Sequence, residues 1–142
     1  MIVSASYKHL EQILFIERAS FSKPWTEYHF KSDLNNKISV NWVFLKNDQA
    51  VGYLFGWHVM DEYHLNNIAV AEPFRGTGIG VHLLKNMELH LKEIEVKSVF
   101  LEVSSSNLPA RKLYEKMSFL PKGERKDYYT KGDDAVLYTL EF

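Results

Sequence analysis

The sequence contains no cysteine. Disulfide bonds, thiolate nucleophiles and zinc sites built on thiolates are therefore excluded. The sequence also lacks an apolar run approaching the ~20 residues of a membrane-spanning helix. Residues 1–6 show neither the basic segment nor the apolar run of a signal peptide. We therefore expect a cytoplasmic protein with no membrane partner.

An excess of charge of either sign is also missing, because 17 lysines and arginines stand against 18 aspartates and glutamates. Nucleic-acid binding needs a concentrated basic surface, so we predict no nucleic-acid partner. The histidines do not indicate a metal site either. His58 and His64 have no carboxylate cluster at ligand spacing beside them, and we predict no bound metal.

The sequence is rich in apolar residues, with 46% hydrophobic and 14% aromatic residues in a chain of 142. This composition excludes a disordered chain. A chain of this length buries roughly two thirds of its unfolded surface around one core. We find no internal repeat, low-complexity tract or flexible linker. We therefore expect a single domain over residues 1–142.

Hydrophobic periodicity divides the chain into helices and strands. The 3.6-residue period is clearest in Ile79, Leu83 and Met87. The two-residue period is clearest in the predicted strand that ends at Val103, where Glu102 lies on the side opposite the alternating apolar residues. The predicted helices cover residues 8–20, 25–35, 79–94 and a short segment after Asn107, a favourable N-cap. The predicted strands cover residues 2–6, 38–44, 50–60, 63–70, 96–103, 119–130 and 135–142. The order βααβββαβαββ indicates a mixed α/β (α+β) fold.

One predicted strand, ending at Val70, leads into a turn with glycines at alternate positions, Gly76, Gly78 and Gly80, and this turn opens a helix. Glycines leave backbone N–H groups uncovered, and a helix N-terminus adds roughly half a positive charge. The combination predicts a site for a phosphate or pyrophosphate. Its spacing fits neither the G-x-G-x-x-G of Rossmann folds nor the Gly-Lys-Ser/Thr of P-loops.

The glycine turn fits another pattern, R/Q-x-x-G-x-G/A, through Arg75, Gly78 and Gly80. This pattern resembles the acetyl-CoA site of the GNAT N-acetyltransferases. A second stretch is similar to the L-E-V…S-N…A…L-Y-x-x-x-G-F run of their RimI-like branch, which acetylates protein N-termini. That stretch comprises Leu101-Glu102-Val103, Ser106-Asn107, Ala110 and Leu113 to Phe119. Pro24-Trp25-Thr26 and residues 125–129 also look like this branch.

The resemblance covers essentially the whole chain and implies the GNAT fold, with a mixed, mostly antiparallel sheet. Two positions depart from the branch pattern. Ser118 replaces a glycine, which costs on the order of 1 kcal/mol if the position needs a positive φ. Ser104 stands where the best-known member has an arginine, and this difference bears on the choice of peptide.

The resemblance implies acetyl-CoA as co-substrate and assigns roles to several residues. Glu102 corresponds to a general base acting through a water, although spacing alone equally allows a solvated strand residue. Tyr114 corresponds to a general acid, although it also fits the buried stripe of its helix. Asn107 would cap that helix and contact the cofactor. The remaining predicted cofactor contacts are the backbone of Ile68, Ala69 and Val70, and the turn Arg75, Gly76, Thr77, Gly78, Ile79 and Gly80.

The acceptor amine is less defined by the sequence. We predict that it contacts Trp25, Asp61, Glu62, Tyr128 and Tyr129. The leading interpretation is an acetyltransferase for a protein N-terminus, such as that of a ribosomal protein, working as a monomer or weak dimer. The alternatives are a small-amine acetyltransferase (polyamine, aminoglycoside or amino acid) and a catalytically silent acyl-CoA-binding module.

Overall fold

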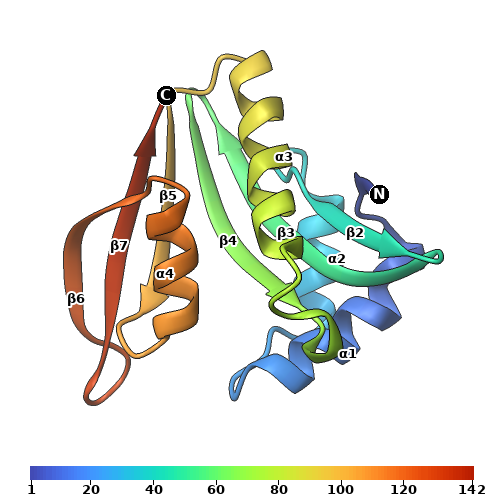
Figure 1. Ribbon diagram of the computed structural model, residues 1–142, viewed down its shortest axis with the longest axis horizontal. Coiled ribbons are helices and arrows are strands. Elements are labelled where there is room, and N and C mark those ends of the chain that lie inside the picture. Colours follow the sequence, from blue (N-terminus) through green and yellow to red (C-terminus); the bar gives the residue numbers. More distant parts are fainter.

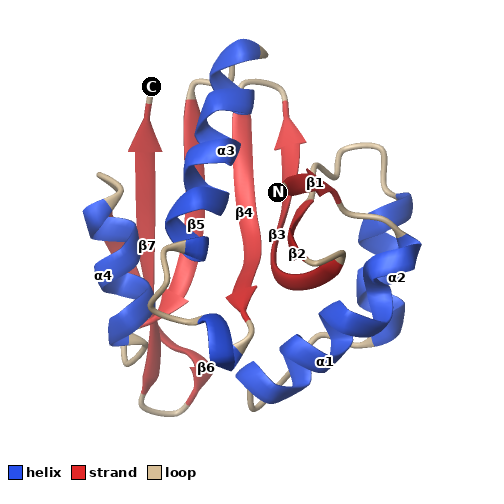
Figure 2. Cartoon of the chain, turned by 45° about the vertical axis from the view of Figure 1, so that its right-hand side comes forward, coloured by secondary structure: helices blue, strands red, loops and turns tan.

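The computed structural model describes residues 1–142 as one seven-stranded sheet with helices on both faces (Figures 1 and 2). The predicted order of helices and strands is confirmed. The helices are α1 (Leu10–Ser20), α2 (Glu27–Asn35), α3 (Ile79–Glu93) and α4 (Leu108–Lys116), with 3-10 turns at Tyr7–His9 and Glu72–Phe74. The strands are β1 (Ile2–Ser4), β2 (Trp42–Lys46), β3 (Gln49–Val59), β4 (Glu62–Val70), β5 (Ser98–Ser104), β6 (Leu120–Thr130) and β7 (Asp133–Glu141). None of the helices has the length and apolarity to cross a bilayer.

The sheet has the order β1-β2-β3-β4-β5-β7-β6, and only the neighbours β4 and β5 run parallel. These two strands pair through Glu62–His64 and Ser98–Phe100 and then diverge toward their C-terminal ends (Figure 1). A β-bulge assists the divergence, because the pairing with β3 moves from Leu65 to Asn67 and leaves Asn66 as an extra residue. The second half of β4 therefore faces an opening instead of a neighbouring strand.

Two apolar clusters hold the helices against the sheet. The larger lies under α3 and α4 and the smaller under α1 and α2, on opposite faces (Figure 2). Alternation along β3 serves both clusters, since Leu54 belongs to the larger while Tyr53 and Phe55 belong to the smaller. The stripe predicted on α3 is buried as far as Leu91. Ile94, the last residue of the predicted helix 79–94, is 39% exposed because it follows α3 as its C-cap.

The strand predicted at residues 38–44 is shifted, because β2 begins at Trp42. Asn41 breaks the ladder on the N-terminal side: its side-chain oxygen accepts the backbone N–H of Gly56 at 3.0 Å. Ser39 keeps only an isolated bridge to Trp57. A polar side chain thus replaces the backbone as hydrogen-bond partner, and the pattern of apolar residues does not reveal this.

Ser118, which departs from the branch pattern, has a φ of 71° directly after α4. The position therefore does use the left-handed region that favours glycine. The serine is exposed, so the cost is conformational and not steric crowding in the core.

Candidate active site

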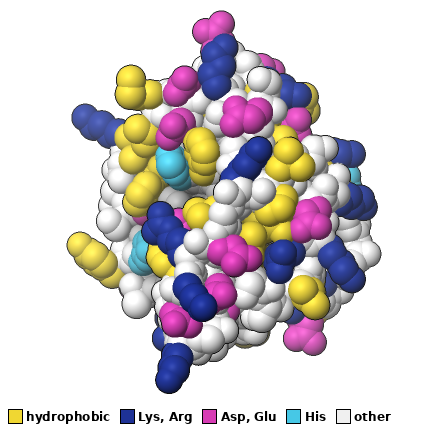
Figure 3. Space-filling view, turned by 90° about the vertical axis from the view of Figure 1, so that its left-hand side faces the viewer, with side chains coloured by type: hydrophobic (Ala, Val, Ile, Leu, Met, Phe, Trp, Pro, Cys, Tyr) yellow, Lys and Arg dark blue, Asp and Glu magenta, His cyan; other side chains and the backbone are white.

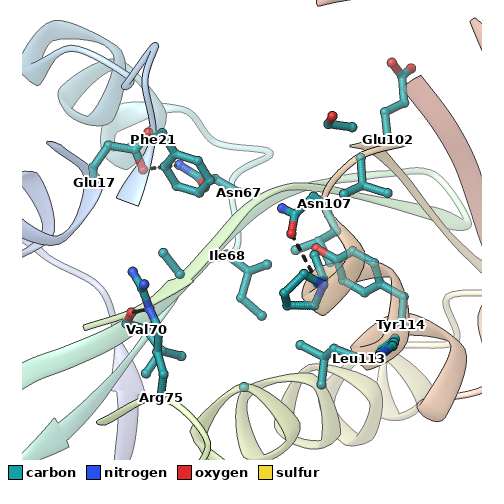
Figure 4. A pocket seen from close by; sticks show the side chains of 18 of the residues that line it. Glu17, Phe21, Asn67, Ile68, Val70, Arg75, Glu102, Asn107, Leu113 and Tyr114 are labelled. Atoms are coloured by element: carbon teal, nitrogen blue, oxygen red, sulfur yellow. Dashed lines mark hydrogen bonds between the residues drawn. The ribbon is translucent and has the colours of Figure 1, made fainter. Parts of the chain in front are cut away.

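A cavity of about 860 Å³ lies where β4 and β5 diverge (Figure 4). Its walls are the end of α1 with the loop that follows, the second half of β4, the glycine turn, the end of β5, α4, and the β6–β7 hairpin. The cavity brings together most of the predicted site residues. These are Trp25, Ile68, Ala69, Val70, Arg75, Gly76, Gly78, Ile79, Gly80, Glu102, Asn107, Tyr114 and Tyr129.

The glycine turn owes its shape to two left-handed residues, Gly76 with a φ of 76° and Gly78 with a φ of 90°. Gly78 is also the N-cap of α3, and no side chain caps the helix there. Gly80 has a different reason to be glycine, because a Cβ atom would lie 3.2 Å from Cδ2 of Leu113 on α4. The turn thus exposes an uncapped helix N-terminus and lets α4 come close, an arrangement that suits a phosphate group.

Arg75 is anchored within the protein. Its Nε donates to the carbonyl of Val70 at 2.9 Å, and one terminal nitrogen donates to the hydroxyl of Ser20 at 2.9 Å. Thr77, also predicted as a cofactor contact, lies outside the lining, and its hydroxyl donates to the carbonyl of Phe74. The two hydrogen bonds of the Arg75 guanidinium join the end of β4 to the end of α1. Three lysines that the sequence analysis did not single out also line the cavity: Lys23, Lys112 and Lys116.

Glu102 projects from β5 on the side opposite Val99, Leu101 and Val103, as predicted. Its carboxylate reaches the cavity and is 28% exposed. Oε1 lies 3.5 Å from a terminal nitrogen of Arg125, whereas Oε2 is buried with no protein donor. Oε2 thus keeps an unused capacity to accept a hydrogen bond, and a group in the cavity reaches it only after a small movement of the side chain or its surroundings.

Asn107 and Tyr114 come from the N-cap and the body of α4, which packs on the sheet face opposite to the one that carries Glu102. Asn107 caps α4, as predicted, by accepting the backbone N–H of Ala110 at 3.3 Å. Tyr114 is buried, packs against Phe119 and Tyr138, and points from α4 toward the cavity (Figure 4). Burial raises the pKa of Tyr114 well above its ordinary value. The hydroxyl therefore remains a proton donor at neutral pH.

Of the adjacent tyrosines on β6, only Tyr129 lines the cavity. Burial, with a further contribution from the Glu102 carboxylate, raises the pKa of Tyr129 to about 12. Tyr128 is half exposed and packs edge-on against Tyr129, with ring centroids 5.0 Å apart. Tyr128 thus supports the wall from outside.

The structure does not bring Asp61 and Glu62 to the cavity. They lie at the turn before β4 and at the first residue of that strand. The cavity lining on β4 begins at Leu65, three residues or about 10 Å along the strand from Glu62 at about 3.3 Å per residue. The Asp61 carbonyl accepts the backbone N–H of Lys97, and a Glu62 carboxylate oxygen lies 3.1 Å from His64. The expectation that an acidic pair in this turn meets the acceptor is therefore not supported by its position.

Sequence analysis missed one buried charge at the cavity, Glu17 on α1, which is 2% exposed. A signal was present, since Glu17 falls three or four residues after the core residues Ile13 and Leu14. A carboxylate at an apolar helix position is unusual. The other missed carboxylate in the lining is Asp133, which accepts a hydrogen bond from the Ser104 hydroxyl.

The face seen from the side of β6 carries lysine and arginine side chains interspersed with aspartate and glutamate (Figure 3). This mixture agrees with the near balance of charges in the sequence. Recognition at the cavity therefore depends on the individual groups that line it.

Comparison with known proteins agrees with the fold. The model of the acetyltransferase (GNAT) family matches residues 10–119. The chain therefore belongs to the acetyltransferase (GNAT) family, whose members use acetyl-CoA, and it is an N-acetyltransferase.

Its relatives lie in the RimI-like branch, as the motifs predicted. The [ribosomal protein bS18]-alanine N-acetyltransferase of Haemophilus influenzae is 36% identical over 85% of this chain and 82% of the relative. An N-alpha-acetyltransferase of Sulfolobus acidocaldarius is 32% identical over 94% of this chain and 87% of the relative. The crystal structure of the ribosomal-protein-S18-alanine N-acetyltransferase from Escherichia coli has a TM-score of 0.93 at 29% identity, covering 99% of this chain and 92% of that chain.

Proposed function

We propose that this protein acetylates the N-terminal α-amine of another protein, with a ribosomal protein in the cytoplasm as the natural acceptor. One observation carries the proposal: the carboxylate of Glu102, on β5, and a buried protonated hydroxyl, on Tyr114 of α4, line the same cavity. The names of the relatives from Haemophilus influenzae and Escherichia coli support the choice of acceptor.

The cavity residues fit an acyl-CoA. The uncapped start of α3 at Gly78 to Gly80 would hold the pyrophosphate, with Lys112 and Lys116 as nearby cations. The unpaired edge of β4 at Ile68 to Val70 would donate backbone N–H groups to the thioester carbonyl. Acetyl-CoA supplies an acetyl group activated as a thioester.

Glu102 is the proposed general base. An α-amine with a pKa near 8 is mostly protonated at pH 7, so it must lose a proton before it reacts. The Glu102 carboxylate, which reaches the cavity, would accept that proton, directly or through a water. This first proton leaves before attack, because an ammonium nitrogen has no lone pair. A second proton leaves the nitrogen after its bond to the acetyl carbon forms and, through the solvent, replaces the proton that Tyr114 gives to the sulfur.

Tyr114 is the proposed general acid. As the carbon–sulfur bond breaks, the sulfur gains a negative charge, and the Tyr114 hydroxyl would give it a proton. The raised pKa of Tyr114 keeps that proton in place at neutral pH. Since a thiol has a pKa near 8.5, the thiolate can also depart with little help.

The acceptor would enter between Trp25 on one side and Tyr129 on the other. Two carboxylates, Glu102 and Asp133, line this part of the cavity. Their negative charge favours an ammonium group over a neutral or anionic acceptor.

The test is an acetyl-CoA turnover assay that follows thiol release with three sets of acceptors: peptides with a free N-terminus, lysine peptides with a blocked N-terminus, and small amines. We expect turnover with the free N-terminal peptides, the bS18 N-terminus among them. Turnover confined to small amines would refute the proposed acceptor. Acetyl-CoA binding with no turnover of any acceptor would instead indicate the silent module.

A further inference from the structure

Glu17 is a buried carboxylate that accepts hydrogen bonds from three separate parts of the chain. Its Oε1 accepts the hydroxyl of Tyr53 on β3 and the side-chain amide of Asn67 on β4, the latter at 2.7 Å (Figure 4). Its Oε2 accepts the backbone N–H of Trp25 at 2.9 Å. Burial and the neighbouring Glu17 charge raise the pKa of Tyr53 far above its ordinary value, so this hydroxyl donates.

A buried carboxylate at a core position destabilises the fold unless its desolvation is compensated. Burial removes the charge from water, and a protein with an apolar side chain of similar size at such a position is often equally stable or more stable. The three donors offset the cost of desolvation only if all of them stay in place. Stability alone therefore does not account for a glutamate at this position. The elements that its hydrogen bonds connect indicate what it does.

Two of the three partners belong to walls of the cavity. Trp25 ends the loop from Phe21 that follows α1, and most of that loop lines the cavity. Asn67 directly follows the bulged residue Asn66 and directly precedes the unpaired edge of β4 at Ile68. The carboxylate thus connects the loop to the bulge, two elements that share no strand pairing.

We propose that Glu17 is a positioning residue for the acceptor: it fixes the Trp25 loop relative to the β4 bulge and so shapes the acceptor side of the cavity. Glu17 itself does not touch the reacting atoms in this proposal. The inference rests on the proposed function, because it takes a peptide N-terminus as the acceptor that the Trp25 wall receives.

The sharpest variant is Glu17→Gln, which keeps the shape and removes the charge. If the amide oxygen faces Tyr53 and Asn67, the amide NH2 group meets the Trp25 N–H, donor against donor. If the amide is flipped, its NH2 group meets that of Asn67. Both wall contacts survive only if the Asn67 amide also turns over, and even then both become neutral hydrogen bonds without the negative charge of the acceptor.

We expect Glu17→Gln to raise the KM for the peptide about tenfold, the factor that the loss of one charge-assisted hydrogen bond carries. The dissociation constant for acetyl-CoA, measured by calorimetry, should stay within about twofold. The matched control is Tyr53→Phe, which removes a hydrogen bond to the same carboxylate but keeps both wall contacts. It should lower the melting temperature and leave the peptide KM nearly unchanged.

A second readout does not require turnover. In protein labelled with 5-fluorotryptophan, the 19F resonance of Trp25, assigned with a Trp25→Phe variant, should shift or broaden in Glu17→Gln. The resonances of Trp42 and Trp57 should not move. This signal tests the Glu17 contact even if no peptide is acetylated, so failure of the proposed function and failure of this inference remain distinguishable.

Three results would overturn the inference: an unchanged peptide KM together with an unchanged Trp25 resonance, an equal loss of acetyl-CoA affinity, or a Tyr53→Phe variant that raises the peptide KM as much as Glu17→Gln does. The last result would indicate a purely structural role.

Discussion

The guanidinium of Arg125 lies 3.5 Å from Oε1 of Glu102, so this carboxylate in the cavity lining has a cation from β6 beside it. The same guanidinium lies over the ring of Tyr128 at 5.4 Å from its centroid. Arg125 is mostly exposed, and an ion pair in that setting is weak. A weak pair is one that an incoming ammonium group can displace.

Arg125→Gln should therefore lower the KM for the acceptor amine by roughly twofold to fivefold, the range of an exposed ion pair. Steady-state kinetics with a fixed, saturating concentration of acetyl-CoA would measure this change. Lys126→Gln removes the same charge from the next residue of β6 and should have little effect. A rise in KM for Arg125→Gln would mean that Arg125 binds the acceptor instead of competing with it.

Glu102→Gln removes the proposed proton acceptor and keeps the size of the side chain. We expect kcat at neutral pH to fall by about 10²-fold to 10⁴-fold, the usual contribution of a general base. Acetyl-CoA affinity, measured by calorimetry, should be retained because the glycine turn is untouched. Unchanged kinetics in the variant would remove Glu102 from the mechanism.

Tyr114→Phe should have a smaller effect, a decrease of roughly tenfold in kcat, because a thiolate leaves with modest help. The pKa of Tyr114 is raised by burial, so the hydroxyl keeps its proton throughout the neutral range. The kcat of the wild-type protein should accordingly show no loss from tyrosine ionisation between about pH 8 and pH 10. If the kcat of Tyr114→Phe equals that of the wild-type protein, Tyr114 has a packing role only.

Buried tyrosines should make the protein sensitive to alkali. Burial, with a contribution from the Asp33 charge, raises the pKa of Tyr63 well above its ordinary value, while in the unfolded chain the side chain ionises near pH 10. Below about pH 10 both states are protonated and the free energy of unfolding does not depend on this group. Above it the unfolded state loses the proton first, so the free energy of unfolding falls by about 1.4 kcal/mol per pH unit for each such tyrosine.

Urea unfolding of Tyr63→Phe between pH 9 and pH 11 would measure this slope. The variant should be less stable at neutral pH, since it loses the hydrogen bond to the Val40 carbonyl, but its stability should fall less steeply with alkali. Leu54→Val is a suitable control, because it destabilises the core without removing a titrating group. Parallel curves for Tyr63→Phe and the wild-type protein would contradict the prediction.

Ser118→Gly should stabilise the protein by about 1 kcal/mol, because glycine adopts a φ of 71° without the strain of a side chain. Thermal unfolding would detect a higher melting temperature. Ser32→Gly, in the exposed middle of α2, should change stability in the opposite direction by a similar amount. A melting temperature for Ser118→Gly equal to or below that of the wild-type protein would show that local contacts of Ser118 compensate the strain.

The sequence predicted features that depend on local patterns. The order of elements, the outward side of Glu102 on β5 and the cap at Asn107 all follow from periodicity or from a side chain that bonds a few residues away. The resemblance to a family supplied the cavity residues that periodicity cannot connect, such as Glu102 and Tyr114. These lie on different elements and line one cavity only in the folded chain.

Features that depend on distant pairings could not be predicted in this way. The bulge at Asn66 exists because of the register between β3 and β4, and no local signal marks it. Asp61 and Glu62 were placed near the acceptor because a turn with two carboxylates looks suitable, but that turn lies at the far end of β4. Glu17 was detectable only as a charge at a core position, and its three partners are 8, 36 and 50 residues away.

The short pairing between β4 and β5 also governs how the molecule holds together. Strand pairing between the half-sheet β1–β4 and the half-sheet β5–β7 is confined to residues 62–64 and 98–100, and the Asp61 carbonyl adds backbone hydrogen bonds from Lys97 and Ser98 at the same end. The rest of the cohesion between the halves comes from side chains, chiefly beneath α3 and α4. A ligand bound along the open edge would contact both half-sheets. Its binding would stabilise their relative position, so occupancy of the cavity should affect the rigidity of the molecule as well as the chemistry.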